Sequence, residues 1–117
     1  GGMKRKGGLS LTGLLFVAWA GIGPGRAQQV DADAAIALAK KNDCFKCHAV
    51  DKNKKAPAYA RIAARLRTKP DGVERVIEHV TTGPQIELQD GSHEDHRIID
   101  TRDPNELKNL ARWILSL

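Results

Sequence analysis

Apolar residues recur at helical spacing in four stretches of the chain, and turn residues separate these stretches. The pattern predicts a first helix from Asp31 or Asp33 to about Asn42, and a second, short helix over Ala58–Arg67. A third begins at Pro70-Asp71-Gly72 and ends at Gly83-Pro84, and a fourth runs from Asp103 to Leu117. No convincing strand pattern is present, so residues 85–102 are predicted to form an extended loop.

The last helix has the clearest local signals. Asp103-Pro104-Asn105-Glu106 resembles a capping box, with Asp103 as the cap and proline at the first helical position. Apolar residues then form one stripe along the helix: Leu107, Leu110, Ala111, Ile114 and Leu117. The third helix carries a comparable stripe: Val73, Val76, Ile77 and Val80. We therefore expect helices that pack on one another through single apolar faces.

The N-terminal stretch has a different pattern. The basic residues Lys4-Arg5-Lys6 precede a mostly apolar run over residues 9–21, and Gly25-Arg26-Ala27 has small residues at the positions that a signal peptidase selects. We expect a secretory signal over residues 1–27, with Gly1 and Gly2 as an artefact before Met3. The run is too short for a comfortable membrane span, so an uncleaved anchor is the less favoured alternative.

Removing this signal changes the charge. Four of the 19 basic residues and none of the 14 acidic ones lie in it, which leaves 15 against 14, a net charge of +1. The basic isoelectric point therefore gives no support for nucleic-acid binding. The charge is unevenly distributed along the chain. Most charged residues in the range 40–69 are basic, and most of those in the range 71–106 are acidic. Such a dipolar surface can orient a small protein on a partner, although a solvated face with no partner explains it equally well.

The residues Cys44-Phe45-Lys46-Cys47-His48 form C-x-x-C-H, the attachment signature of c-type haem. Cysteines three residues apart lie on one face of a helical turn, where each thiol can add to a vinyl group of one porphyrin. His48 then becomes the proximal iron ligand. A zinc site needs about four ligands, and no second closely spaced ligand pair with zinc-finger spacing appears. A disulfide across two residues closes too small a loop to stabilise much.

The chain resembles the small bacterial class I monohaem cytochromes c. Cys47-His48-Ala49-Val50-Asp51 and Ala56-Pro57-Ala58-Tyr59 are similar to the family's haem segment and following loop, and Leu110-Ala111-Arg112-Trp113-Ile114-Leu115-Ser116 to its last helix. The resemblance implies an all-α class I cytochrome c fold over residues 28–117, with four to five short helices around one covalent haem c. It also implies that the backbone carbonyl of Pro57 accepts a hydrogen bond from His48.

The distal ligand departs from the family pattern. The family normally uses a methionine from the loop before the last helix, whereas the only methionine here is Met3, in the expected signal. His96 lies one residue from the family's methionine position, and Gly91 gives its loop the flexibility to bring an imidazole inward. His93 is the alternative, His79 is less well placed, and an iron with water or no sixth ligand is the remaining possibility.

These expectations favour a periplasmic single-electron carrier with two histidine ligands on the iron. Exchanging methionine for histidine should lower the reduction potential. The partners would be redox proteins that dock transiently. A haem-based binder or sensor of small gases is the alternative, because the same missing methionine supports it. A haem subunit of a larger redox enzyme is less favoured. No catalytic constellation accompanies the haem motif, so the chain is not expected to be an enzyme.

Overall fold

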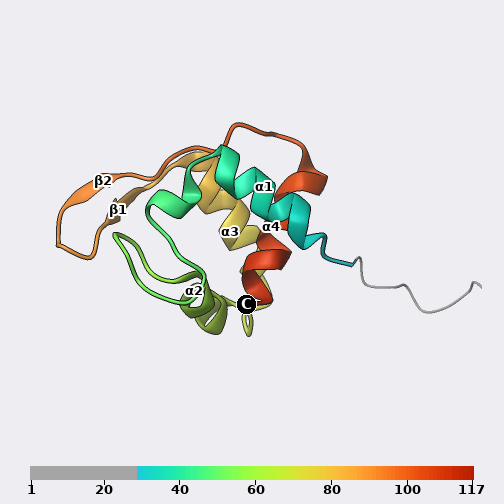
Figure 1. Cartoon of the computed structure of the whole chain (residues 1–117), viewed down its shortest axis with the longest axis horizontal. Coiled ribbons are helices and arrows are strands. Elements are labelled where there is room, and N and C mark those ends of the chain that lie inside the picture. The colour runs from blue at the N-terminus through green and yellow to red at the C-terminus, as the bar shows by residue number, and fades with distance from the viewer. Residues whose placement is uncertain (1–28) are drawn as a thin grey trace, which may run out of the picture.

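A computed structural model describes residues 29–117 (Figure 1). The expected signal, residues 1–27, lies outside them. The elements are α1 (Ala32–Lys41), the 3-10 helix η1 (Cys44–Lys46), α2 (Tyr59–Leu66), α3 (Gly72–Thr82), β1 (Gln85–Glu87), β2 (His93–Asp95) and α4 (Pro104–Leu115). None of the helices in this part of the chain is long and apolar enough to cross a bilayer.

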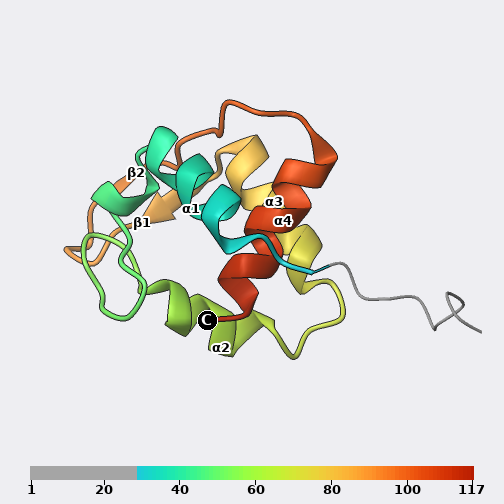
Figure 2. The ribbon, with the colours of Figure 1, turned by 45° about the vertical axis from the view of Figure 1, so that its right-hand side comes forward.

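The helix α4 is the centre of the fold, because α1, α2 and α3 all pack against it. Figures 1 and 2 show α1 crossing α4, so the two ends of the domain meet. Asp31 and Asn109 join them: the Asp31 N–H donates to the Asn109 side-chain oxygen, and the Asn109 amide donates to the Asp31 carbonyl, both at 2.8 Å. Alanines at the crossing, Ala35, Ala39 and Ala111, are at most 1 % exposed. Their small side chains let the two helix backbones approach closely.

Helix boundaries follow local signals. Asp31 caps α1 by accepting a hydrogen bond from the Ala34 N–H, as predicted for one of the two candidate caps. Asp103 caps α4 by accepting from the Asn105 N–H. The Glu106 carboxylate accepts from the Thr101 hydroxyl, which itself accepts from the Asp103 N–H. The capping box is therefore closed through a threonine rather than directly.

The prediction that residues 85–102 form a loop without strands was wrong for part of this range. Residues 85–87 and 93–95 pair as an antiparallel hairpin, which extends to one side of the helices in Figure 1. An Asp90-Gly91 turn connects them, with Gly91 at a φ of 87° and Ser92 donating to the Asp90 carboxylate. Ile86 and Leu88 point inward, so the hairpin covers one side of the pocket described below.

The segment 96–100 follows the hairpin and is tied to the end of α1. The Asn42 amide donates to the Asp100 carboxylate and to the Leu38 carbonyl, while its oxygen accepts from the Asp100 N–H, all at 3.0 Å. Lys41 adds an ion pair with Asp100 at 3.4 Å. The buried Ile99 donates its N–H to the Val80 carbonyl of α3. The segment therefore has a defined path along the edge of the helices.

Candidate haem site

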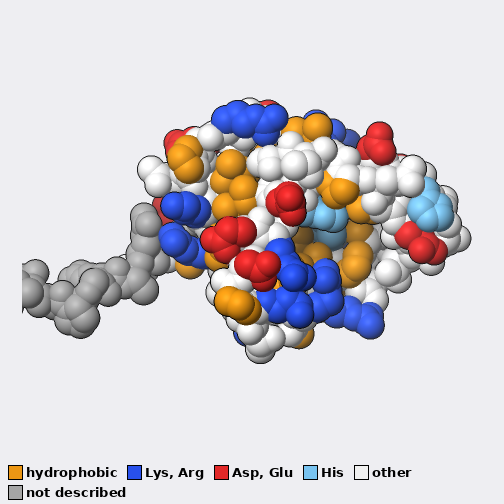
Figure 3. All heavy atoms as spheres, turned by 180° about the vertical axis from the view of Figure 1, so that it is seen from behind, with side chains coloured by type: hydrophobic (Ala, Val, Ile, Leu, Met, Phe, Trp, Pro, Cys, Tyr) orange, Lys and Arg blue, Asp and Glu red, His pale blue; other side chains and the backbone are white. Residues whose placement is uncertain are grey.

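A cavity of about 350 Å³ lies between η1, α2, α3, the hairpin and the segment 96–100. Figure 3 shows it as a hollow in which histidine and hydrophobic side chains are visible beside a group of lysine and arginine side chains. Its apolar lining comes from α2, α3, the hairpin, the segment 96–100 and also α4, and includes Ile62, Leu66, Val76, Val80, Ile86, Leu88, Ile99, Leu110 and Ile114. The cavity thus offers an apolar space for a flat hydrophobic group.

Both cysteines and His48 of the C-x-x-C-H motif line this cavity. The motif folds as one tight turn, because Cys47 and His48 donate their N–H groups to the Cys44 carbonyl at 3.2 and 3.0 Å. Asp43 precedes it with a φ of 61°, which turns the chain out of α1. Both thiols are free, and burial raises the pKa of the Cys44 thiol. Two sulfur atoms and an imidazole therefore face one cavity.

The His48 ring is held on two sides. Its Nδ1 lies 2.7 Å from the Pro57 carbonyl oxygen, which can only accept, so Nδ1 carries the proton and Nε2 keeps its lone pair. The Tyr59 ring stacks on the imidazole with centroids 4.5 Å apart and planes 17° apart. Burial lowers the pKa of His48 despite the Pro57 carbonyl. The ring is thus held in one orientation, with Nε2 available to a metal ion.

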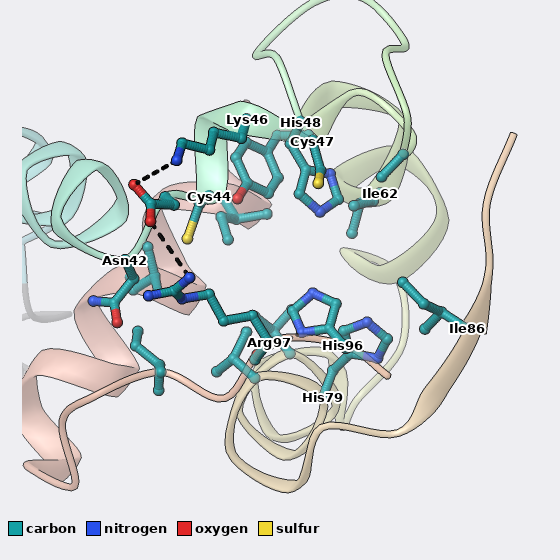
Figure 4. Close-up of a pocket in the computed structure, with 18 of the residues that line it drawn as sticks. Asn42, Cys44, Lys46, Cys47, His48, Ile62, His79, Ile86, His96 and Arg97 are labelled. Atoms are coloured by element: carbon teal, nitrogen blue, oxygen red, sulfur yellow. Dashed lines mark hydrogen bonds and ion pairs between the residues drawn. The ribbon is translucent and has the colours of Figure 1, made fainter. Parts of the chain in front are cut away.

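His96 lies across the cavity from His48 (Figure 4), with ring centroids 6.4 Å apart and planes inclined by 45°. The His96 Nδ1 lies 2.8 Å from the carbonyl oxygen of Arg97, which can only accept, so Nδ1 carries a proton and Nε2 is the ring nitrogen left for a metal ion. The His96 N–H donates to the Pro84 carbonyl at 2.8 Å, which fixes the backbone. The expected flexibility at Gly91 is not what places this ring, because Gly91 belongs to the hairpin turn.

The other two histidines differ from each other in position. His93 lies on β2, is exposed and does not line the cavity. His79 of α3 does line it, and its ring centroid is 4.3 Å from that of His96. His79 is exposed as a whole residue, but desolvation by the surrounding protein lowers its pKa to about 4, and the charges of His96, His48 and Arg65 contribute.

Sequence reasoning gave His79 little weight, although a signal was available. Val76 and Val80 of α3 both line the cavity, and His79 lies three residues after Val76, on the same helix face. No sequence pattern indicates the ion pair that joins the two sides of the site. Arg97 contacts the Asp43 carboxylate at 3.4 Å, and Lys46 contacts it at 3.8 Å. The residue after His96 is thereby linked to the residue before Cys44.

This donor set fits a covalently attached haem. Two thiols three residues apart can each form a thioether, the S–H adding across a vinyl double bond. The 6.4 Å between the His48 and His96 ring centroids leaves room for one metal ion between two ring nitrogens, since each metal–nitrogen bond is about 2 Å long. The apolar lining suits the porphyrin. No group of three or more His, Cys, Asp or Glu residues arranged for a protein-only metal site occurs within residues 29–117.

A small helical domain built around such a pocket is a class I cytochrome c fold. The sequence agrees: the Cytochrome c family matches residues 32–117, and the chain belongs to this family. It is 31 % identical over 80 residues to cytochrome c-551 of Pseudomonas denitrificans, covering 68 % of this chain and 93 % of that protein. It is 30 % identical over 80 residues to cytochrome c-552 of Hydrogenobacter thermophilus, covering 68 % and 78 %.

Solved structures agree with this assignment. The class 1 cytochrome MtoD from Sideroxydans lithotrophicus ES-1 is 46 % identical and has a TM-score of 0.72, with 75 % of this chain and 97 % of that chain covered. Wild-type cytochrome c552 of Nitrosomonas europaea is 31 % identical with a TM-score of 0.58, covering 74 % and 99 %. The predicted class I fold and the predicted single covalent haem c are thus confirmed, and the chain is an electron-carrying haem protein.

Proposed function

We propose that the protein is a periplasmic single-electron carrier whose haem is attached through Cys44 and Cys47 and ligated by His48 and His96. The observation that carries this proposal is the pair of imidazoles facing each other across the cavity. Each ring has its Nδ1 proton directed to a backbone carbonyl, that of Pro57 or of Arg97. In each ring, Nε2 is therefore the nitrogen left for the iron.

The chemistry that the haem supplies is a reversible one-electron change at its iron. The protein's part is to hold both imidazoles so that neither ring must move when the charge changes. Pro57 and Tyr59 hold His48, while Pro84 and Arg97 hold His96. With histidine in place of the family's usual methionine, the reduction potential should lie below that of methionine-ligated relatives.

The ligand assignment is tested by spectroscopy of the holoprotein. The oxidised parent should be low-spin and lack the methionine–iron charge-transfer band. His96→Ala should open the iron, give a high-spin spectrum and bind carbon monoxide readily when reduced. His93→Ala is the matched control, because that exposed histidine lies only three residues away, and it should leave the spectrum unchanged. A low-spin His96→Ala variant would contradict the assignment.

Attachment and export are tested separately. The denatured mature protein should have the mass of the polypeptide plus one haem, and Cys44→Ala or Cys47→Ala should each leave one thioether only. N-terminal sequencing of the exported protein should begin at or near Gln28. Retention in the membrane fraction would favour an uncleaved anchor.

Rapid, tight binding of carbon monoxide to the parent would favour the gas-binding alternative over electron transfer.

A further inference from the structure

His79 has no role in the site as described so far, although it lies inside it. Its ring is inclined by 61° to the His96 ring, with centroids 4.3 Å apart, which is an edge-to-face contact. Figure 4 shows His79 and His96 next to each other on the side of the cavity opposite His48. His79 therefore differs from an ordinary surface histidine of α3, because its ring contacts the ring of His96.

The backbones of the two histidines are held in one unit. The His96 N–H is bonded to the carbonyl of Pro84, just after the end of α3. Three residues further on, the Ile99 N–H is bonded to the carbonyl of Val80, the neighbour of His79. Gly83 ends α3 with a φ of 62°, and a Cβ atom there would lie 2.8 Å from the His96 carbonyl oxygen. The α carbons of His79 and His96 consequently cannot separate without breaking these contacts.

The remaining freedom of His96 is rotation of its side chain. The Arg97 carbonyl restrains this rotation at one ring atom, Nδ1. One hydrogen bond leaves the ring free to swing about that atom, whereas a second contact on the ring surface fixes its plane. The His79 ring supplies that second contact.

We propose that His79 is a positioning residue for the distal imidazole: its ring contact holds His96 directed at His48 and slows its departure from the iron. The inference rests on the proposed ligation by His96. Removing the contact should leave the ligand set unchanged but let His96 swing away more often, so that external ligands reach the iron faster. The spin state of the iron thus reports whether the ligand is present, and the rate of carbon monoxide binding reports how easily it is displaced.

The test compares three substitutions in the holoprotein: His79→Ala, His79→Leu, which keeps volume without a ring, and His79→Phe, which keeps the ring edge without nitrogen. The readouts are the rate of carbon monoxide binding to the reduced protein and the electron paramagnetic resonance spectrum of the oxidised protein. We expect the alanine and leucine variants to stay low-spin and to bind carbon monoxide about five- to tenfold faster, the scale of an aromatic edge-to-face contact. Their resonance lines should broaden or shift, since these report the orientation of the imidazole planes.

The phenylalanine variant should restore both the parent rate and the parent spectrum. The proposal is overturned if His79→Leu binds carbon monoxide at the parent rate, because filled volume would then be sufficient. It is also overturned if His79→Ala becomes high-spin, because His79 would then be a ligand itself. A failure of the underlying assignment is a different result, a low-spin His96→Ala variant, so the two hypotheses are distinguished.

Discussion

Among residues 29–117, Asn42 is the only polar or charged side chain that is buried, at 3 % exposure. Its amide connects the end of α1 to Asp100, 58 residues later in the chain. Because Asp100 belongs to the segment that also contains His96, one side chain couples the C-x-x-C-H side of the domain to the opposite side of the cavity.

Replacing Asn42 by alanine should cost roughly 2–3 kcal/mol, because it removes three hydrogen bonds and leaves a cavity in a buried position. The Asp31–Asn109 contact provides a matched control. Asn109→Ala also removes hydrogen bonds between distant segments, but at a more accessible site, and should cost about 1 kcal/mol. Urea unfolding of both holoproteins measures the difference. Equal losses would show that burial does not strengthen the Asn42 network.

Asp100 should make stability depend on pH. The Asn42 hydrogen bond, followed by Lys41, holds the pKa of Asp100 below its ordinary value of 3.8. A lowered folded pKa stabilises the fold above the ordinary value, and this contribution is lost as the pH falls through the folded pKa. Asp100→Asn should therefore lower the urea midpoint at pH 7, and the gap to the parent should close as the pH falls below 3.8 and through the folded pKa of Asp100. A constant gap would contradict the linkage.

At the level of elements, the end of α3 and the segment 96–100 approach each other so closely that an added side chain at Gly83 should disturb both. Gly83→Ala would place a side chain at a φ of 62°, with its Cβ 2.8 Å from the His96 carbonyl oxygen. We expect a loss of roughly 2 kcal/mol or more and an altered visible spectrum, because His96 must shift.

Gly91→Ala is the control for backbone conformation alone. Its φ is also positive, at 87°, but a Cβ atom there meets nothing within 4 Å. This variant should lose about 1 kcal/mol and keep the parent spectrum. If Gly91→Ala altered the spectrum as much as Gly83→Ala, the close approach to His96 would not be the cause.

The helices were predictable from the sequence, whereas the hairpin was not, for a physical reason. Asp31, Gly83 and Asp103 act on the backbone next to them, so their effect can be read locally. The strand His93–Asp95 contains no apolar residue and is exposed throughout, so it shows no alternation between buried and exposed positions. Only the Asp90-Gly91 turn indicated the hairpin.

The site was predictable in part. C-x-x-C-H specifies the proximal side through its own spacing, while the choice of His96 rested on resemblance to a family. The position of His79 depends on which face of α3 docks on α4, and the Asn42–Asp100 contact on where two distant segments meet. The apolar stripe of α3 places His79 beside the buried helix face but does not identify its partner, and no local pattern indicates the second contact.

For the whole molecule, the small size of the buried side chains determines how far the domain depends on its haem for stability. Leu110 is the only large residue below 2 % exposure in the described part of the chain, and many of the other core residues are alanines. Such a core gives a domain of this size little apolar area to bury. The haem therefore completes the core.

The Cys44→Ala/Cys47→Ala double variant, made without haem, should lack the helical circular dichroism of the holoprotein. A helical variant that unfolds cooperatively would disprove this.

The charges around the cavity should steer small redox reagents. Basic side chains at its edge include Lys46, Arg65, Arg75 and Arg97. Electron exchange with an anionic reagent such as ferricyanide should slow as salt is added, and exchange with a cationic reagent should become faster. An uncharged reagent is the control. Rates for the anionic reagent that do not depend on salt would exclude steering by this edge.

The pairing of Asp31 with Asn109 also determines when the domain can form. The two residues are 78 positions apart, and within residues 29–117 the main packing partner of α1 is α4. During synthesis, α1 must wait until α4 has emerged, because contacts between distant segments cannot form earlier. Cys44 and Cys47 therefore stay accessible in an unfolded chain until the last helix arrives, which leaves time for covalent modification before the structure encloses them. A chain truncated within α4 should therefore stay unfolded, with both cysteines accessible.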